Sequence, residues 1–211
     1  MRTLKALFEN NRRWAEQAVG QNPDFFKRLV PHQAPQYLWI GCSDSRVPPN
    51  EIVGLLPGDL FVHRNVANQV IHTDFNCLAV LQYAVDMLRV RHVIVCGHYD
   101  CGGIKAALDL SAHGLIDNWL HSIRQMREKY HRELARFRSL EGRVDRLCEI
   151  NVREQVQHVA DTTIVREAWA RGQHLAIHGW IYDVHNGRLK DMKLSLSSAA
   201  GTGELHRRNR A

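Results

Sequence analysis

Three short runs of almost continuous apolar residues constrain the fold of this chain more than any other feature. They span Gln36 to Gly41, Leu60 to Arg64 and His92 to Gly97, and none alternates between apolar and polar residues. Such runs are typical of strands buried on both faces, as in a parallel sheet covered by helices. Parallel strands need a crossover, and apolar residues at helical spacing predict a helix over Asp74 to Leu88, between the second and third runs.

Further helices are expected before and after these strands in the sequence. Apolar spacing predicts an amphipathic N-terminal helix from Leu4 to Ala18 and a long helix from Leu115 to Leu134. Asn151, followed three residues later by Glu154, resembles a capping box and predicts the start of another helix. A last helix is expected from Thr163 to Arg171.

The C-terminal part of the chain predicts a β-hairpin. A strand-like run from His174 to Val184 is followed by Asn186-Gly187, a strong type I′ turn signal. A second run from Leu189 to Leu194 then returns antiparallel to the first. We therefore expect an antiparallel strand at one edge of the sheet.

The chain is expected to form a single domain over residues 1–211, because no repeat, low-complexity linker or composition shift divides it. The predicted fold is α/β, with a mostly parallel central sheet of about four strands plus an antiparallel edge strand, flanked by helices. Residues 1–20 are expected to form a helical arm and residues 195–211 a loose tail.

The composition excludes several classes of protein. No window holds the roughly 18 uninterrupted apolar residues that a membrane span needs, and the N-terminus lacks the apolar core of a secretory signal. A cytoplasmic location is therefore expected. Lys and Arg exceed Asp and Glu by six (28 against 22), but no RNA-binding or helix-turn-helix signature accompanies them, which disfavours nucleic acid as a partner. The odd count of five cysteines argues for metal binding by some of them rather than a disulfide framework.

Two cysteines and a histidine stand where predicted strands end. Cys42 directly follows the first run, and His98 and Cys101 follow the third. Open α/β sheets place their ligands at the carboxyl ends of strands, so these side chains converge if the two strands are neighbours. Thiolates and imidazole favour Zn²⁺, and three protein ligands leave a fourth position for water or for Asp44. The remaining cysteines are interpreted as packing residues: Cys77, Cys96 and Cys148.

These motifs resemble those of the β-class carbonic anhydrases. The resemblance lies in Cys42-Ser-Asp-Ser-Arg46, His98-x-x-Cys101-Gly-Gly103, the segments Phe61 to Asn68 and His178 to Tyr182, and the spacing between them. It implies one zinc ion per chain bound by Cys42, His98 and Cys101, and reversible hydration of carbon dioxide to bicarbonate. It also implies a homodimer, or a tetramer built of dimers, in which the N-terminal helix embraces the partner.

The resemblance also places an Asp44–Arg46 pair beside the zinc, and the chemistry of these residues agrees with that function. Two thiolates and a neutral imidazole cancel the charge of zinc, so its water is less acidified than at an all-histidine site and an alkaline optimum is expected. Zinc hydroxide is the expected nucleophile. Asp44 can accept its remaining proton in a hydrogen bond, and Arg46 can keep Asp44 ionised.

A regulatory site is implied by the same resemblance. In a bacterial subgroup of the family, a Trp, an Arg and a Tyr resemble a non-catalytic bicarbonate pocket that stabilises an inactive state with Asp on the zinc. Trp39, Arg64 and Tyr182 match them in this chain. Bicarbonate and ligation by Asp44 would then switch the enzyme off. The alternative is packing for Trp39 and Tyr182 and a structural anchor for Arg64.

Other functions stay open at this point. A hydrolase of carbonyl sulfide or carbon disulfide resembles the family at the same ligands, and access to the pocket would decide between them. A non-catalytic zinc protein would leave the free fourth position and the Asp44–Arg46 pair without purpose. A nucleic-acid module would gather its basic residues on one face and bind with steep salt dependence. The sequence does not select a proton shuttle among the histidines.

Overall fold

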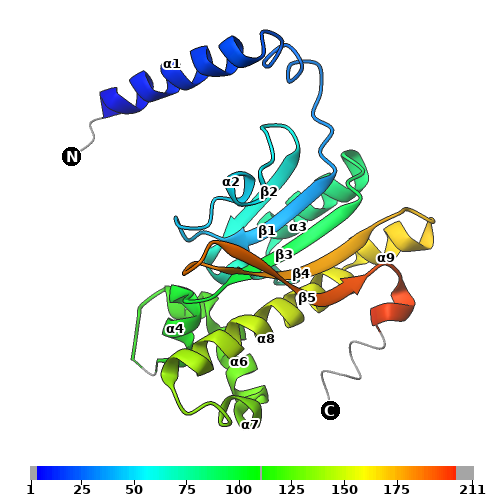
Figure 1. Cartoon of the computed structure of the whole chain (residues 1–211). Coiled ribbons are helices and arrows are strands. Elements are labelled where there is room, and N and C mark those ends of the chain that lie inside the picture. The colour runs from blue at the N-terminus through cyan, green and yellow to red at the C-terminus, as the bar shows by residue number, and fades with distance from the viewer. Residues whose placement is uncertain (1–3, 110, 203–211) are drawn as a thin grey trace. The chain divides into compact units, whose positions relative to one another are not determined.

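The computed structural model describes residues 4–109 and 111–202, which form two compact units divided after Ala34. The first unit contains helix α1 (Leu4–Gln21), which confirms the predicted N-terminal helix (Figure 1). In this unit the ring of Trp14 packs edge to face against the rings of Phe25 and Phe26. The expected arm is therefore part of a longer N-terminal unit with a small aromatic cluster of its own.

The second unit is built around a five-stranded sheet in the order β2-β1-β3-β4-β5 (Figure 1). The first four strands in that order pair parallel, and β5 pairs antiparallel with β4. The predicted fold class is confirmed. The strands are β1 (Tyr37–Cys42), β2 (Leu60–Asn65), β3 (His92–His98), β4 (Ala176–Asp183) and β5 (Arg188–Leu196).

Burial differs between the three apolar runs. β1 and β3 are buried almost throughout, as predicted, whereas most of β2 is only partly buried. The reason is position, because β2 forms the edge of the sheet and has a strand on one side only. An apolar edge strand keeps side chains available for contacts outside the chain.

Helices and turns connect these strands. The first helices after β1 are α2 (Pro49–Val53), the 3-10 turn η1 (Val66–Asn68), α3 (Phe75–Gln82) and the π-helical turn η2 (Tyr83–Met87). After β3 come α4 (Gly102–Leu108), α5 (Ile116–Trp119), α6 (His121–Lys129), α7 (His131–Leu134), α8 (Leu140–Asp161) and α9 (Thr163–Ala170). The helix predicted over Thr163 to Arg171 is confirmed as α9.

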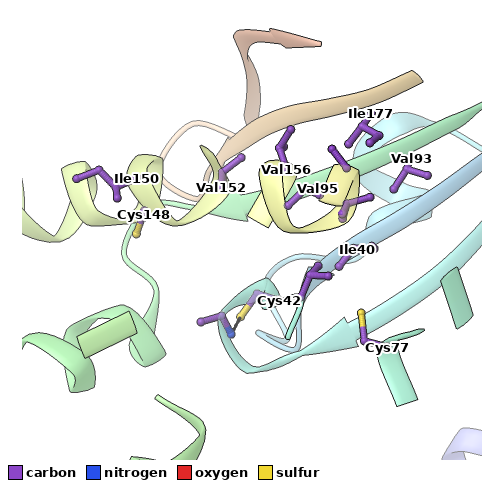
Figure 2. Packing of buried hydrophobic residues seen from close by; sticks show 14 of the residues in the cluster. Ile40, Cys42, Cys77, Val93, Val95, Cys148, Ile150, Val152, Val156 and Ile177 are labelled. Atoms are coloured by element: carbon purple, nitrogen blue, oxygen red, sulfur yellow. Dashed lines mark hydrogen bonds between the residues drawn. The ribbon is translucent and has the colours of Figure 1, made fainter. Parts of the chain in front are cut away.

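The core is centred on α8, which packs against β3 and β4. Figure 2 shows Val152 and Val156 pointing from α8 toward the strands that carry Val95 and Ile177. The helix comes close because β3 has a glycine at the contact: a Cβ on Gly97 would lie 2.6 Å from Val152 Cγ2. This tight packing fixes the end of β3, where the site lies.

Two predicted helices differ from the observed ones. The long helix predicted over Leu115 to Leu134 is divided into α5, α6 and α7. Tyr130, with φ of −104° and ψ of 20°, leaves helical geometry between α6 and α7, whereas Leu120, with φ of −81° and ψ of −1°, stays in the right-handed helical region between α5 and α6. Both residues are buried in the same hydrophobic core, which accounts for the continued apolar spacing. The helix predicted over Asp74 to Leu88 begins as expected but widens to a π-helical turn near its end.

The predicted helix start at Asn151 is wrong. α8 begins eleven residues earlier, at Leu140, behind Ser139, whose side chain accepts a hydrogen bond from the Gly142 amide. Asn151 is buried in the middle of the helix and donates a 2.9 Å hydrogen bond to the carbonyl of Ala67. A polar residue that resembled a cap in the sequence is thus a buried contact to the turn after β2.

The hairpin is confirmed, but its turn type is not. Asp183 pairs with Arg188 across a four-residue loop, and Asn186 does not adopt the positive φ that a type I′ turn requires. The Asp183 carboxylate instead organises the loop by accepting hydrogen bonds from the His185 amide and the Asn186 side chain. β5 continues to Leu196, and residues 203–211 of the expected tail lie outside the described residues.

Candidate metal centre

The ends of β1 and β3 bring three predicted ligands together. Cys42 closes β1, His98 closes β3 and Cys101 precedes α4, and the two strands pair directly with each other. One ligating atom from each residue lies within 4.8 Å of the others, and all three side chains are buried. The sulfur atoms of Cys42 and Cys101 are 3.9 Å apart. The arrangement has the size and the donors of a metal site.

The hydrogen bonding of His98 fits a metal ligand. Its Nδ1 lies 2.8 Å from the carbonyl of Tyr99, which can only accept, so Nδ1 carries the proton and Nε2 keeps a free lone pair. Nε2 is buried and has no hydrogen-bond partner within residues 4–109 and 111–202. A buried nitrogen without a partner is costly, and a cation between it and the two sulfurs would satisfy it. Thiolate and imidazole together are the donors that Zn²⁺ favours.

The two sulfurs differ in how readily they lose a proton. The thiol of Cys101 donates to Cys42 and is the main reason that the pKa of Cys42 is lowered to about 4. The same contact and burial raise the pKa of Cys101. The amide of Ala67 also donates to the Cys42 sulfur at 3.4 Å, from a residue with φ of 63°. Asn151 holds that strained turn through the Ala67 carbonyl.

Asp44 and Arg46 form a close pair beside this cluster. Arg46 Nε lies 3.0 Å from Asp44 Oδ1, and Arg46 Nη2 lies 2.7 Å from Asp44 Oδ2. This two-point contact holds the pKa of Asp44 well below its usual range. Asp44 Oδ2 is also 3.8 Å from His98 Nε2. The carboxylate therefore stays ionised and borders the place where a metal would lie.

Asp100 is a site residue that the sequence analysis missed. It lies between His98 and Cys101 with φ of 59°, and its carboxylate accepts a 3.1 Å hydrogen bond from Arg46 Nη1. The same carboxylate pairs with Lys105 in α4. A charged side chain in the loop between two ligands was the only signal in the sequence, since Arg46 is 54 residues away.

Trp39, Arg64 and Tyr182 lie on the sheet, near but not within the cluster. Trp39 is completely buried with Ile94 and Cys96, Tyr182 packs against the same group, and the indole Nε1 of Trp39 has no partner. Arg64 donates from Nε to the Cys42 carbonyl at 2.7 Å and from Nη2 to the Asp44 carbonyl at 2.5 Å. Arg64 is thus an anchor for the main chain that carries Cys42 and Asp44.

A second group of possible metal ligands lies on the edge strand β2 and at the start of α3. One ligating atom from each of His63, Asp74 and Cys77 lies within 4.8 Å of the others. The three already have other surroundings: Asn65 Nδ2 lies 3.2 Å from His63 Nε2, and Asp74 caps α3 through the Asn76 amide. Burial raises the pKa of Cys77 to about 12. This group has no donor prepared for a cation in the way that His98 is.

A protein-family model described as carbonic anhydrase matches residues 37–189. A carbonic anhydrase of Emericella nidulans is 42% identical over 91% of this chain and 84% of its own length. One from Pseudomonas aeruginosa is 33% identical over 88% of this chain and 86% of its own.

Solved structures give the same result. A Coccomyxa β-carbonic anhydrase in complex with acetazolamide superposes with a TM-score of 0.93 and 37% identity, covering 99% of this chain and 96% of that one. A tetrameric β-carbonic anhydrase of Sordaria macrospora gives a TM-score of 0.87 and 40% identity, covering 92% of this chain and 98% of that one. Among the described residues, no helix is both long and apolar enough to cross a bilayer.

Proposed function

The chain belongs to the β-class carbonic anhydrases, and from that premise we propose that it hydrates carbon dioxide reversibly. The reaction would take place at one zinc ion per chain, bound by Cys42, His98 and Cys101. The observation that carries the proposal is the buried, unpartnered Nε2 of His98 beside two sulfurs. A Zn²⁺ ion bound there would supply an acidified water as the nucleophile. Because the two cysteine thiolates would neutralise the ion, its water would lose a proton only at higher pH, and we expect activity to rise toward alkaline pH.

Asp44 and Arg46 orient the reaction. Asp44 is ionised at neutral pH and accepts a hydrogen bond from the attacking water, which directs a lone pair at the carbon of the substrate. Arg46 keeps that carboxylate charged and fixes both of its oxygens. The proton released by hydration leaves through a route that the described side chains do not single out.

Asp44 has two competing partners, and we propose that their competition regulates the enzyme. While Asp44 pairs with Arg46, it would leave room for water beside Cys42, His98 and Cys101, and a move of its carboxylate toward His98 Nε2, 3.8 Å away, would fill that room. Bicarbonate would favour the closed state through Trp39, Arg64 and Tyr182. One observation supports this: among the described residues, Trp39 Nε1 is a buried donor without a partner.

A homodimer, or a tetramer built of dimers, is proposed for the assembly. Leu4, Leu7 and Phe8 expose apolar surface along α1, and β2 leaves one edge of the sheet open. A second copy would cover both features. Sedimentation should give a multimer of the 24.3 kDa chain, and a monomer at micromolar concentration would refute the assembly. The expected cytoplasmic location stays a prediction.

Stopped-flow hydration of carbon dioxide tests the activity. We expect hydration in the zinc-loaded protein, loss on removal of the metal with a chelator, and recovery when one equivalent of zinc per chain is restored. Hydration that survives complete removal of zinc would contradict the proposal. Turnover of carbon disulfide or carbonyl sulfide without hydration of carbon dioxide would favour the hydrolase instead.

Trp39→Phe tests the bicarbonate pocket, because it removes the unpartnered N–H and keeps an aromatic ring. We expect weaker inhibition by bicarbonate with unchanged zinc content. Trp180→Phe is the matched control, since Trp180 meets Trp39 edge to face on the same side of the sheet. Equal bicarbonate inhibition in the parent and in Trp39→Phe would make Trp39 a packing residue.

A further inference from the structure

We propose that Asp100 is a positioning residue, which holds Arg46 in the orientation that pairs with Asp44. The inference rests on the proposed function, because it concerns which partner Asp44 takes. The contacts of the Asp100 carboxylate are with Arg46 and Lys105 rather than with Cys42, His98 or Cys101. It acts through Arg46.

The contacts show how Arg46 is held from two sides. Its Nε and Nη2 contact the two oxygens of Asp44 at 3.0 and 2.7 Å. Its Nη1 donates to Asp100 Oδ2 at 3.1 Å, and Nη2 also reaches the main-chain oxygen of Asp100 at 3.3 Å. A guanidinium is a rigid planar fork, so contacts along two edges fix its plane as well as its position.

Asp44 alone would hold Arg46 loosely. The Arg46 side chain is 48% exposed, and an isolated ion pair at such exposure is screened and contributes little. Asp44 and Arg46 also lie on the same short segment, so their pairing does not anchor that segment to anything else. Asp100 is 54 residues away, in the loop between His98 and Cys101. Its contact with Arg46 joins the two loops that carry the metal donors.

The backbone at Asp100 indicates that the side chain is retained for its contacts. The residue has φ of 59°, in the left-handed region where glycine is the least costly residue. Both carboxylate oxygens are used, because Oδ1 pairs with Lys105 and Oδ2 with Arg46. Lys105 lies in α4 and holds the carboxylate from the other side. The position therefore keeps a strained acidic residue that links a helix to Arg46.

The consequence concerns the partner of Asp44. Asp44 Oδ2 lies 3.8 Å from His98 Nε2, so a small movement of the carboxylate would carry it from Arg46 to the metal donors. A steady Arg46 favours the arrangement in which Asp44 stays away from the metal. Asp100 thus biases Asp44 toward the active arrangement by immobilising its partner.

Two substitutions and one control test the inference. Asp100→Gly suits the backbone and removes both carboxylate contacts, and Asp100→Asn tolerates the same φ while keeping a single oxygen. Glu141→Gln is the control, because Glu141 lines the same cavity of about 290 Å³ as Asp100 and Lys105 but has no contact with Arg46. The readouts are solvent exchange of the Arg46 Nε–H by ¹⁵N NMR, identified through Arg46→Lys, and kcat/KM for hydration.

In Asp100→Gly we expect exchange of the Arg46 Nε–H to rise and kcat/KM to fall, each by about tenfold, with zinc content unchanged. Asp100→Asn should be intermediate, and Glu141→Gln should match the parent. Unchanged exchange in Asp100→Gly, or faster exchange with unchanged kcat/KM, would overturn the inference. The two proposals can fail separately. If neither the parent nor any variant hydrates carbon dioxide, the proposed function is wrong. Faster exchange of the Arg46 Nε–H in Asp100→Gly would then still show that Asp100 immobilises Arg46.

Discussion

Two groups of side chains among the described residues have the composition of a metal site, and the hydrogen bonding of their histidines differs. Cys42, His98 and Cys101 form one group, and His63, Asp74 and Cys77 form the other, each within 4.8 Å. His98 donates a hydrogen bond from Nδ1–H to the Tyr99 carbonyl, and its Nε2 has no partner among the described residues. His63 Nε2 already accepts from Asn65. Proximity is common to both groups, whereas a free lone pair belongs to the first.

Two further hydrogen bonds fix the side-chain amide of Asn65 in the orientation that occupies His63 Nε2. Its Oδ1 accepts from the Gln69 amide and its Nδ2 donates to the Gln69 carbonyl, both at 2.7 Å. Turning the amide to release His63 would break both contacts and leave buried groups without partners. The lesson is that a neighbouring amide can decide whether a histidine is free to bind metal.

The largest expected effect is loss of a sulfur ligand. Cys101→Ser should lose most of the bound zinc and at least about a hundredfold of the hydration rate, because serine is a poor zinc ligand. Cys77→Ser, in the other group, should keep both. Elemental analysis and stopped-flow assays check this. A Cys101→Ser protein with full zinc would remove the cluster as the metal site.

Loss of the Asp44 carboxylate charge should have the next largest effect. Asp44→Asn should retain zinc but lose about a hundredfold in hydration, because a neutral amide has one acceptor oxygen instead of two and cannot both pair with Arg46 and accept the hydrogen bond of the attacking water in the same way. Asp74→Asn is the matched control, since asparagine also caps helices well. Hydration that is untouched in Asp44→Asn would leave Asp44 without a catalytic role.

The sulfurs should react differently in the metal-free protein. At pH 7 Cys42 is a thiolate, because its pKa is lowered to about 4, whereas Cys77 is a protonated thiol with a pKa of about 12. Iodoacetamide should therefore modify Cys42 faster than Cys77, and added zinc should protect Cys42. Peptide mapping by mass spectrometry measures both rates. Equal labelling of the two cysteines would contradict this ordering.

The smallest effect concerns stability at acid pH. Burial lowers the pKa of His63, so folding favours its neutral form and unfolding takes up a proton. Its contribution is present above the unfolded pKa of about 6.5 and is lost as pH falls through that value toward the folded pKa. His63→Gln should flatten the fall in unfolding free energy between pH 7 and 5, as measured by urea titration. It should do so only in part, because burial also lowers the pKa of His158 and His178. A parent whose stability does not fall would refute the linkage.

Much of the fold follows from local pattern. Continuous apolar runs located β1, β2 and β3. Cys42 and His98 end β1 and β3, and Cys101 follows three residues after β3. The sequence could not show which strand would lie at the edge, because the order of strands depends on contacts between distant segments. β2 therefore proved more exposed than its composition indicated.

The missed features share one physical cause, which is pairing across long separations. Asn151 matched a cap in sequence, but its partner is the carbonyl of Ala67, 84 residues away. Asp100 and Arg46 are 54 residues apart. Local patterns place donors near one another, but only the three-dimensional contacts decide which of them is free.

Anomalous diffraction at the zinc edge, from crystals of enzyme with measured hydration activity, tests the comparison between the two groups most directly. We predict one anomalous peak per chain, within bonding distance of Cys42 Sγ, His98 Nε2 and Cys101 Sγ, and none beside His63. A peak at His63, Asp74 and Cys77, or active crystals with no zinc at Cys42, His98 and Cys101, would contradict the account.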